Sequence, residues 1–130
     1  GAFLNGRRIR ISGETALDRA LLATGFAYDR RKSDQDNLGE FAAFLKAARA
    51  VRRDGSAALD LCYVAAGRLD GFWEFKLAPW DVAAGYLIVE EAGGRCSDLS
   101  GEAAPASGST VVASYGRIHH AMLDVLNQVR

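Results

Sequence analysis

Strand-like and helix-like segments alternate along this chain, and their order restricts the fold more than any other feature of the sequence. Residues 20–26 form a compact apolar run that is typical of a buried strand. Apolar side chains then recur every three or four residues, which predicts an amphipathic helix over 37–51. The aromatic-rich residues 70–75 predict another strand.

The same alternation continues to the end of the chain. Further helices are expected over 56–66, 81–92 and 117–128, and further strands over 7–12, 95–99 and 109–114. The polar residues 30–37 are expected to form a loop. This order predicts an α/β protein of the layered α+β kind, with a mixed sheet flanked by helices, and argues against an all-β or all-helical fold.

Composition restricts the organisation and the partners. The chain has 130 residues, of which 49% are apolar and 25% charged, so we expect one globular domain over 1–130. The formal net charge is zero, which provides no basic field for nucleic acid or an anionic membrane surface. No apolar run approaches the roughly 20 residues of a membrane span. Cys62 and Cys96 are too few for a disulfide framework, so we expect reduced thiols in a cytoplasmic protein.

The stretch from Pro79 to Gly94 contains the most informative pattern. Asp81 lies near an expected helix start, where its carboxylate can accept backbone N–H groups, and as residues alone this is best interpreted as an N-cap. Ala83, Ala84 and Gly85 leave the first turn almost without side-chain bulk. Small residues beside a carboxylate permit close approach by another backbone, a ligand or a metal.

This stretch resembles the C-terminal signature of the inositol monophosphatase family. The matching residues are Trp-Asp-x-Ala-Ala-Gly at 80–85 and Ile-Val-x-Glu-Ala-Gly-Gly at 88–94. The segments 1–6, 55–61, 65–67 and 70–74 resemble the family as well, so the likeness extends over nearly the whole chain and is greatest to the bacterial branch.

The resemblance implies a role for particular residues. It makes Asp81 a catalytic residue and a ligand of the Mg²⁺ cluster, because Mg²⁺ prefers carboxylate oxygen and water. It makes Glu74 the acceptor for a substrate hydroxyl, whereas the alternative is an exposed glutamate at a strand end. It places Gly55, Ser56 and Ala57 against the polyol, although Ser56 serves equally well as a helix N-cap.

The family's upstream motifs do not occur in this chain. They are a metal-binding Glu-Glu pair and an Asp-Pro-Ile/Leu-Asp-Gly-Thr sequence, and Glu90-Glu91 lies too late to be that pair. Asp81 alone cannot organise a two-metal phosphoryl-transfer site. We therefore expect the chain to be the C-terminal, substrate-side half of such an enzyme, without activity on its own.

The implied activity is Mg²⁺-dependent hydrolysis of a sugar or polyol phosphate, with inositol 1-phosphate as the leading substrate and a homodimer as the expected assembly. Phosphatases of the same fold that act on 3′-phosphoadenosine 5′-phosphate, fructose 1,6-bisphosphate or histidinol phosphate are alternatives. A non-catalytic interaction or dimerisation fragment is the alternative from another class.

Two further groups are given structural interpretations. His119 and His120 are neighbours on an expected helix and do not share a face, so we expect surface or capping histidines and no metal pair. Cys62 lies on an apolar helix face and is expected to be a small core residue.

Overall fold

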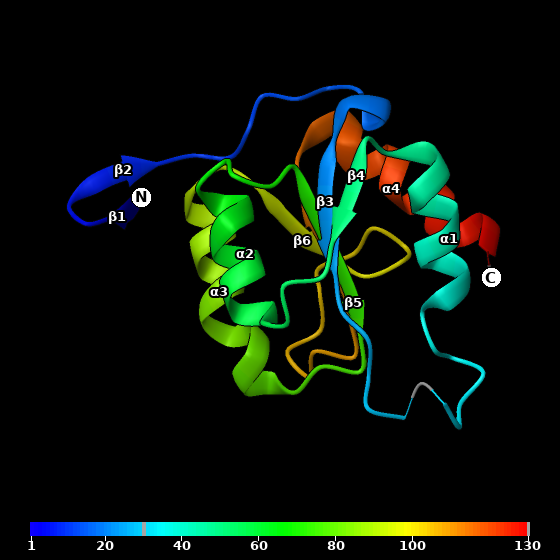
Figure 1. The fold of residues 1–130 in the computed structure, drawn as a ribbon. Helices are drawn as coiled ribbons and strands as arrows, with labels where there is room; N and C mark the ends of the chain where they lie inside the picture. The colour runs from blue at the N-terminus through cyan, green and yellow to red at the C-terminus, as the bar shows by residue number, and fades with distance from the viewer. Residues whose placement is uncertain (30, 130) are drawn as a thin grey trace.

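A five-stranded mixed sheet forms the centre of the protein in the computed structural model, which describes residues 1–29 and 31–129 (Figure 1). The sheet order is β4-β3-β5-β7-β6. Its strands are β3 (Leu21–Thr24), β4 (Ala50–Arg52), β5 (Gly71–Phe75), β6 (Arg95–Ser97) and β7 (Thr110–Ser114). β3 pairs in parallel with β4 and β5, while β7 runs antiparallel to both β5 and β6. The expected mixed sheet is confirmed.

Helices cover both faces of this sheet. They are α1 (Leu38–Ala47), α2 (Ala57–Ala65), α3 (Pro79–Glu91) and α4 (Gly116–Val129), with a 3₁₀ turn η1 at Leu17–Arg19. Figure 1 shows α2 and α3 on one face and α1 and α4 on the other. The helices predicted over 56–66, 81–92 and 117–128 are therefore confirmed to within two residues at each end. Among the described residues, none of the helices has the length and apolar character needed to cross a membrane.

The helix predicted over 37–51 is too long. It ends at Ala47, and 50–52 form the edge strand β4. Ala48 already has extended backbone, and the N–H groups of Arg49 and Ala50 bond to the carbonyl of Ala20 in the neighbouring chain segment. Val51 packs into the same core from the strand, so its apolar character matched the helical period without belonging to the helix.

The strand predicted over 7–12 is shorter and lies outside the central sheet. β2 (Arg7–Ile9) pairs antiparallel with β1 (Ala2–Leu4) in a separate hairpin that projects from the body of the protein (Figure 1). Asn5 and Gly6 form its turn with φ of 52° and 80°, the left-handed conformation that two-residue hairpin turns require.

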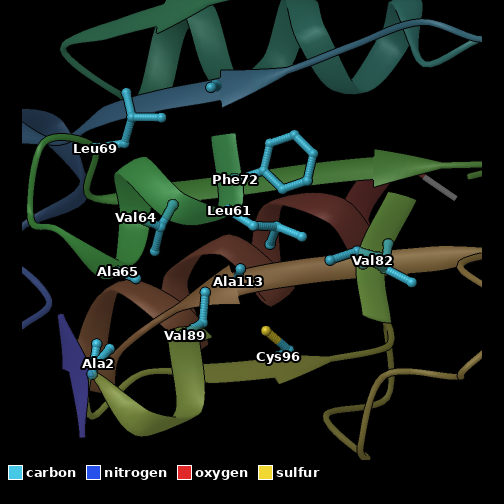
Figure 2. Packing of buried hydrophobic residues seen from close by; sticks show 13 residues of the cluster. Ala2, Leu61, Val64, Ala65, Leu69, Phe72, Val82, Val89, Cys96 and Ala113 are labelled. Atoms are coloured by element: carbon cyan, nitrogen blue, oxygen red, sulfur yellow. The ribbon is translucent and has the colours of Figure 1, made fainter. Parts of the chain in front are cut away.

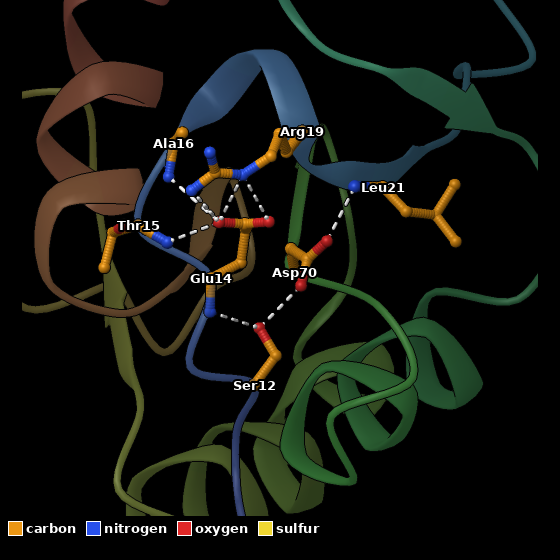
Figure 3. Close-up of polar contacts among 7 residues, drawn as sticks. All are labelled: Ser12, Glu14, Thr15, Ala16, Arg19, Leu21 and Asp70. Atoms are coloured by element: carbon orange, nitrogen blue, oxygen red, sulfur yellow. Dashed lines mark hydrogen bonds and ion pairs between the residues drawn. The ribbon is translucent and has the colours of Figure 1, made fainter.

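Polar contacts fasten the segment after this hairpin to the start of β5. Figure 3 shows the Asp70 carboxylate accepting bonds from Ser12 Oγ at 2.5 Å and from the backbone N–H of Leu21 at 2.7 Å. Beside it, Glu14 pairs with Arg19 at 3.1 Å, and these bonds hold the pKa of Glu14 down at about 2. The chain entering β3 is therefore tied to the strand beside it.

The core between α2, α3 and the sheet explains why a glycine stands at position 85 of α3. Leu61, Phe72, Val82 and Val89 are buried together there (Figure 2). A Cβ atom on Gly85 would lie 2.5 Å from Cδ1 and 2.8 Å from Cβ of Leu61. The glycine is therefore needed for close contact between α2 and α3.

His119 is buried, so the expectation of a surface or capping histidine is wrong for this residue. Its Nε2 lies 2.6 Å from Ser97 Oγ and its Nδ1 lies 2.7 Å from Ser114 Oγ. Burial lowers the pKa of His119 to about 4, and the positive charges of Arg95 and His120 act in the same direction. His120 faces solvent, which confirms that the two histidines do not share a face.

Candidate functional site

One cavity of about 440 Å³ opens where β3 and β5 end and where α2 and α3 begin. These ends of the strands and helices lie at the lower side of the view in Figure 1. Ligands of open α/β sheets bind at this edge, because loops and helix N-termini converge there. We call it the carboxylate pocket. Its lining residues are Thr24, Gly25, Phe26, Tyr28, Arg53, Gly55, Ser56, Ala57, Ala58, Asp60, Glu74, Leu77 and Asp81.

All five residues that the sequence singled out line this pocket. They come from three elements that are distant in the chain: the loop and first turn of α2, the end of β5 and the first turn of α3. They are Gly55, Ser56, Ala57, Glu74 and Asp81. Their convergence was expected from the resemblance alone.

Asp81 lies at the third residue of α3, not at its N-cap. The cap position is Ala78, and Asp81 Oδ2 accepts the backbone N–H of Ala78 at 2.8 Å. The carboxylate therefore does stabilise the helix start, from inside the first turn. The same side chain also lines the pocket, so it caps the helix and forms part of the pocket wall. Its neighbour Trp80 is 83% exposed.

Glu74 is half-buried, so the alternative of an exposed strand-end glutamate is wrong. Along β5, Trp73 and Phe75 point to the core under α1 and α4, so Glu74 points to the opposite face, where the pocket lies. Burial raises the pKa of Glu74 to about 7, and the negative charges of Asp60 and Asp81 add to this effect.

The start of α2 combines a helix cap with a pocket wall. Gly55 has a φ of 94°, which places the following chain into the cap with little steric cost. Ser56 Oγ accepts the backbone N–H of Leu59 at 3.2 Å, as an N-cap does. Ala57 is the first helical residue, and its small side chain leaves the helix N-terminus open to the pocket.

Asp60 is a pocket residue to which the sequence assigned no role. It follows Ser56 by one helical turn, and its backbone N–H bonds to the Ser56 carbonyl at 2.9 Å. The residue is 1% exposed, and Oδ1 has no hydrogen-bond partner in the described part of the chain. Burial raises the pKa of Asp60 to about 7, helped by the charge of Asp54 and opposed by that of Arg52. A carboxylate in an otherwise buried helical face was the signal that could have found it.

A buried polar network supports the pocket floor. Asn37 Nδ2 donates to Thr24 Oγ1 at 2.9 Å and to the Gly25 carbonyl at 2.8 Å, while its Oδ1 accepts Trp73 Nε1–H at 2.7 Å. Thr24 Oγ1 donates to the Trp73 carbonyl at 2.6 Å. The ends of β3 and β5 are therefore locked together directly beside Glu74. Asn37 closes the segment 30–37 that the sequence treated as a polar loop, of which Arg30 lies outside the described residues.

The pocket mouth contains a cation. The Arg53 guanidinium lies over the Phe26 ring, 4.8 Å from its centroid, and the Phe26 ring meets Phe41 edge to face at 5.5 Å. Arg53 is exposed and lines the pocket. The wall is therefore acidic inside and has a positive group at its rim.

The whole chain matches the model of the inositol monophosphatase family, over residues 1–130. An inositol-1-monophosphatase of a Synechocystis species is 47% identical over 126 residues, which are 97% of this chain and 44% of that protein. The Nus factor SuhB of Pseudomonas aeruginosa is 53% identical over 103 residues, covering 78% of this chain and 38% of that protein.

A solved inositol monophosphatase from an Anabaena (Nostoc) species has the same fold. It superposes with a TM-score of 0.93 at 43% identity, over 97% of this chain and 52% of that one. The chain spans about half the length of the curated relatives it matches.

Proposed function

The chain belongs to the inositol monophosphatase family, and we propose that it forms the C-terminal, substrate-side part of a Mg²⁺-dependent hydrolase of sugar or polyol phosphates. Inositol 1-phosphate is the leading substrate. Glu74, Asp81 and the N-terminus of α2 converge in one pocket, and this convergence is the main support for the proposal.

The surroundings of Asp81 suit a hard divalent cation. Asp81 supplies carboxylate oxygen, and its negative charge adds to the burial and the Asp60 charge that raise the pKa of Glu74, so a cation at Asp81 would relieve unbalanced negative charge. Among residues 1–29 and 31–129, no three His, Cys, Asp or Glu side chains are grouped closely enough to hold a metal ion. Asp81 is therefore proposed as one ligand of a site that other residues complete.

When bound, Mg²⁺ would neutralise charge on the phosphate and lower the pKa of a water molecule for in-line attack on phosphorus. The residues of this chain orient the leaving polyol. Glu74 would accept a hydrogen bond from one hydroxyl of the polyol, and the Ser56 hydroxyl and the N-terminal N–H groups of α2, at the wall of the same pocket, would contact other polyol oxygens. The bond from Ala78 N–H to Asp81 Oδ2 holds the proposed ligand in one orientation.

The direct test is phosphate release by the complete protein that contains this chain. Inositol 1-phosphate is compared with 3′-phosphoadenosine 5′-phosphate, fructose 1,6-bisphosphate and histidinol phosphate, each with Mg²⁺ and with EDTA. We expect Mg²⁺-dependent hydrolysis with the highest kcat/KM for inositol 1-phosphate. If none of the four esters is hydrolysed, the proposal is wrong. If another ester has the highest kcat/KM, the proposed substrate is wrong but the proposed phosphatase activity stands.

An interaction role is a second candidate, since relatives of this chain carry the name Nus factor SuhB. On the projecting hairpin, Phe3 is 61% exposed and Leu4 is 42% exposed. Apolar side chains at such a tip suit a protein contact. We also propose that the protein is a cytoplasmic homodimer. Sedimentation compares the molecular mass of the wild-type protein with that of the variant in which Phe3→Ser and Leu4→Ser are introduced together. Unchanged mass would exclude the hairpin from that interface.

A further inference from the structure

The pocket wall contains a carboxylate for which the proposed chemistry has no use so far. Asp60 is 1% exposed, and its Oδ1 has no hydrogen-bond partner in residues 1–29 and 31–129. Buried polar atoms without partners are rare in proteins, and an ionised oxygen in that position is costly. A group that destabilises the empty fold in this way is a candidate for binding a ligand.

The groups around Asp60 determine what kind of ligand can meet it. Glu74 of β5 lines the same pocket as Asp60, and the negative charge of Asp60 raises its pKa, while Asp54 acts on Asp60 in the same sense. Arg52 is engaged by Asp54 at 3.2 Å, and Arg53 lies over Phe26 at the rim. No described ion pair reaches Asp60.

This environment excludes an anionic group and favours a neutral donor. A phosphate beside two carboxylates would meet like charges at short range. A hydroxyl, in contrast, can donate its proton to Oδ1 and provide the missing partner. Hydrogen bonds to a charged acceptor are about twice as strong as those between neutral groups.

We propose that Asp60 binds a second hydroxyl group of the polyol, beside the hydroxyl that Glu74 accepts. The inference rests on the proposed function, because it takes a polyol phosphate as the substrate. Two carboxylates from different elements, α2 and β5, would then accept hydrogen bonds from two hydroxyls of one ring. Selectivity for a polyol over a simple phosphate ester follows from this pair, because an ester without hydroxyls leaves both oxygens unpartnered.

The test compares substrates with and without hydroxyl groups in the complete protein. Asp60→Ala removes the acceptor, and Asp60→Asn keeps its shape with a neutral carbonyl. Asp54→Asn is the matched control, since it removes a nearby negative charge that does not line the pocket. For Asp60→Ala we expect kcat/KM for inositol 1-phosphate to fall about 10- to 100-fold, with a smaller loss for Asp60→Asn. Turnover of p-nitrophenyl phosphate and inhibition by inorganic phosphate should stay within about twofold of wild type.

Thermal melting separates a ligand-binding role from a structural one. Removing an unpartnered buried carboxylate should leave the melting temperature unchanged or raise it. A lower melting temperature in both variants would show that another part of the protein pairs with Asp60, and would overturn the inference. Equal losses on inositol 1-phosphate and p-nitrophenyl phosphate would overturn it too, since they indicate a role at the metal or the phosphate. If the wild-type protein hydrolyses neither ester, the proposed function fails. If it hydrolyses both esters and Asp60→Ala loses the same activity on each, only this inference fails.

Discussion

The carboxyl group of Glu74 lies directly against the backbone of Gly25. A Cβ atom at position 25 would be 2.8 Å from Cδ and 2.9 Å from Oε2 of Glu74, closer than such atoms approach one another. The end of β3 is therefore part of the surface on which this side chain rests, although the two residues are far apart in the sequence.

Gly25→Ala is expected to displace the Glu74 carboxylate with little effect on stability, because the end of a flexible side chain can move aside. With Glu74 as the hydroxyl acceptor, KM for inositol 1-phosphate should rise at least about tenfold. Gly13→Ala is the control, since a Cβ there has nothing within 4 Å. Steady-state kinetics and thermal melting on both variants check this, and an unchanged KM for Gly25→Ala would remove Glu74 from polyol binding.

Gly85→Ala is expected to destabilise the fold, because the new methyl group would press into Leu61. Overpacking of this kind costs about 1–3 kcal/mol, from which a better helix propensity of about 1 kcal/mol is regained. Urea unfolding measures the difference. The double variant Gly85→Ala with Leu61→Ala should lose less stability than the sum of the losses in the two single variants, because the truncated Leu61 makes room for the methyl group. A loss equal to that sum would contradict the proposed contact.

Acidification should weaken the contribution of His119 to stability. Its pKa is about 4 in the folded protein and near 6.5 when unfolded, so at this residue the unfolded chain takes up the proton first. The contribution of His119 to the free energy of unfolding should fall as the pH drops from about 6.5 to about 4, by at most about 3 kcal/mol, and should level off below that. The pKa values of Asp60 and Glu74, raised to about 7, act with the opposite sign in this window, so the contribution of His119 is read from a comparison with a variant.

Urea unfolding of wild type and His119→Gln at pH 7, 6 and 5 measures that contribution. The free-energy difference between the two proteins should be largest at pH 7, because the serine hydroxyls lose their partner in the variant, and should shrink as the pH falls. His120→Gln, at the exposed neighbour, should show the same pH dependence as wild type. A difference between wild type and His119→Gln that does not change with pH would show that His119 does not contribute to the pH dependence.

Asp81→Asn separates the capping oxygen from the charge. The amide oxygen can still accept the N–H of Ala78, so the melting temperature should change little. A metal-ligand role predicts weaker Mg²⁺ binding and a loss of turnover of more than about 100-fold. Phosphate release over a Mg²⁺ series and melting are measured on the same sample. Activity near wild type at saturating Mg²⁺ would leave Asp81 as a helix cap only.

Residues 1–130 alone are expected to release negligible phosphate from inositol 1-phosphate with Mg²⁺. The reason is that the described residues contain no cluster of three potential metal ligands. Comparison with the complete protein at equal concentration tests this. Comparable turnover would show that this chain alone assembles a sufficient site.

The features that sequence reasoning captured depend on local patterns. Ser56 sits before an apolar helical run, and its capping oxygen could be predicted from that position alone. Features that depend on contacts between distant segments were missed. Val51 fitted the helical period but pairs across the sheet, and Asn37 looked like a loop residue although it bonds to both β3 and β5. Asp60 lacked a role because only the fold shows that its carboxylate is buried at the pocket.

The two tryptophans of the chain provide a built-in optical readout of this architecture. Trp73 is fully buried, with its ring 4.2 Å from Phe44 and its indole N–H bonded to Asn37, whereas Trp80 is 83% exposed beside Asp81. Their fluorescence should therefore separate by wavelength, blue-shifted for Trp73 and red-shifted for Trp80. Loss of the strand framework would expose Trp73 and shift the blue component to the red, whereas the emission of the already exposed Trp80 would change little. A single emission spectrum can thus follow unfolding of the strand framework without any added label.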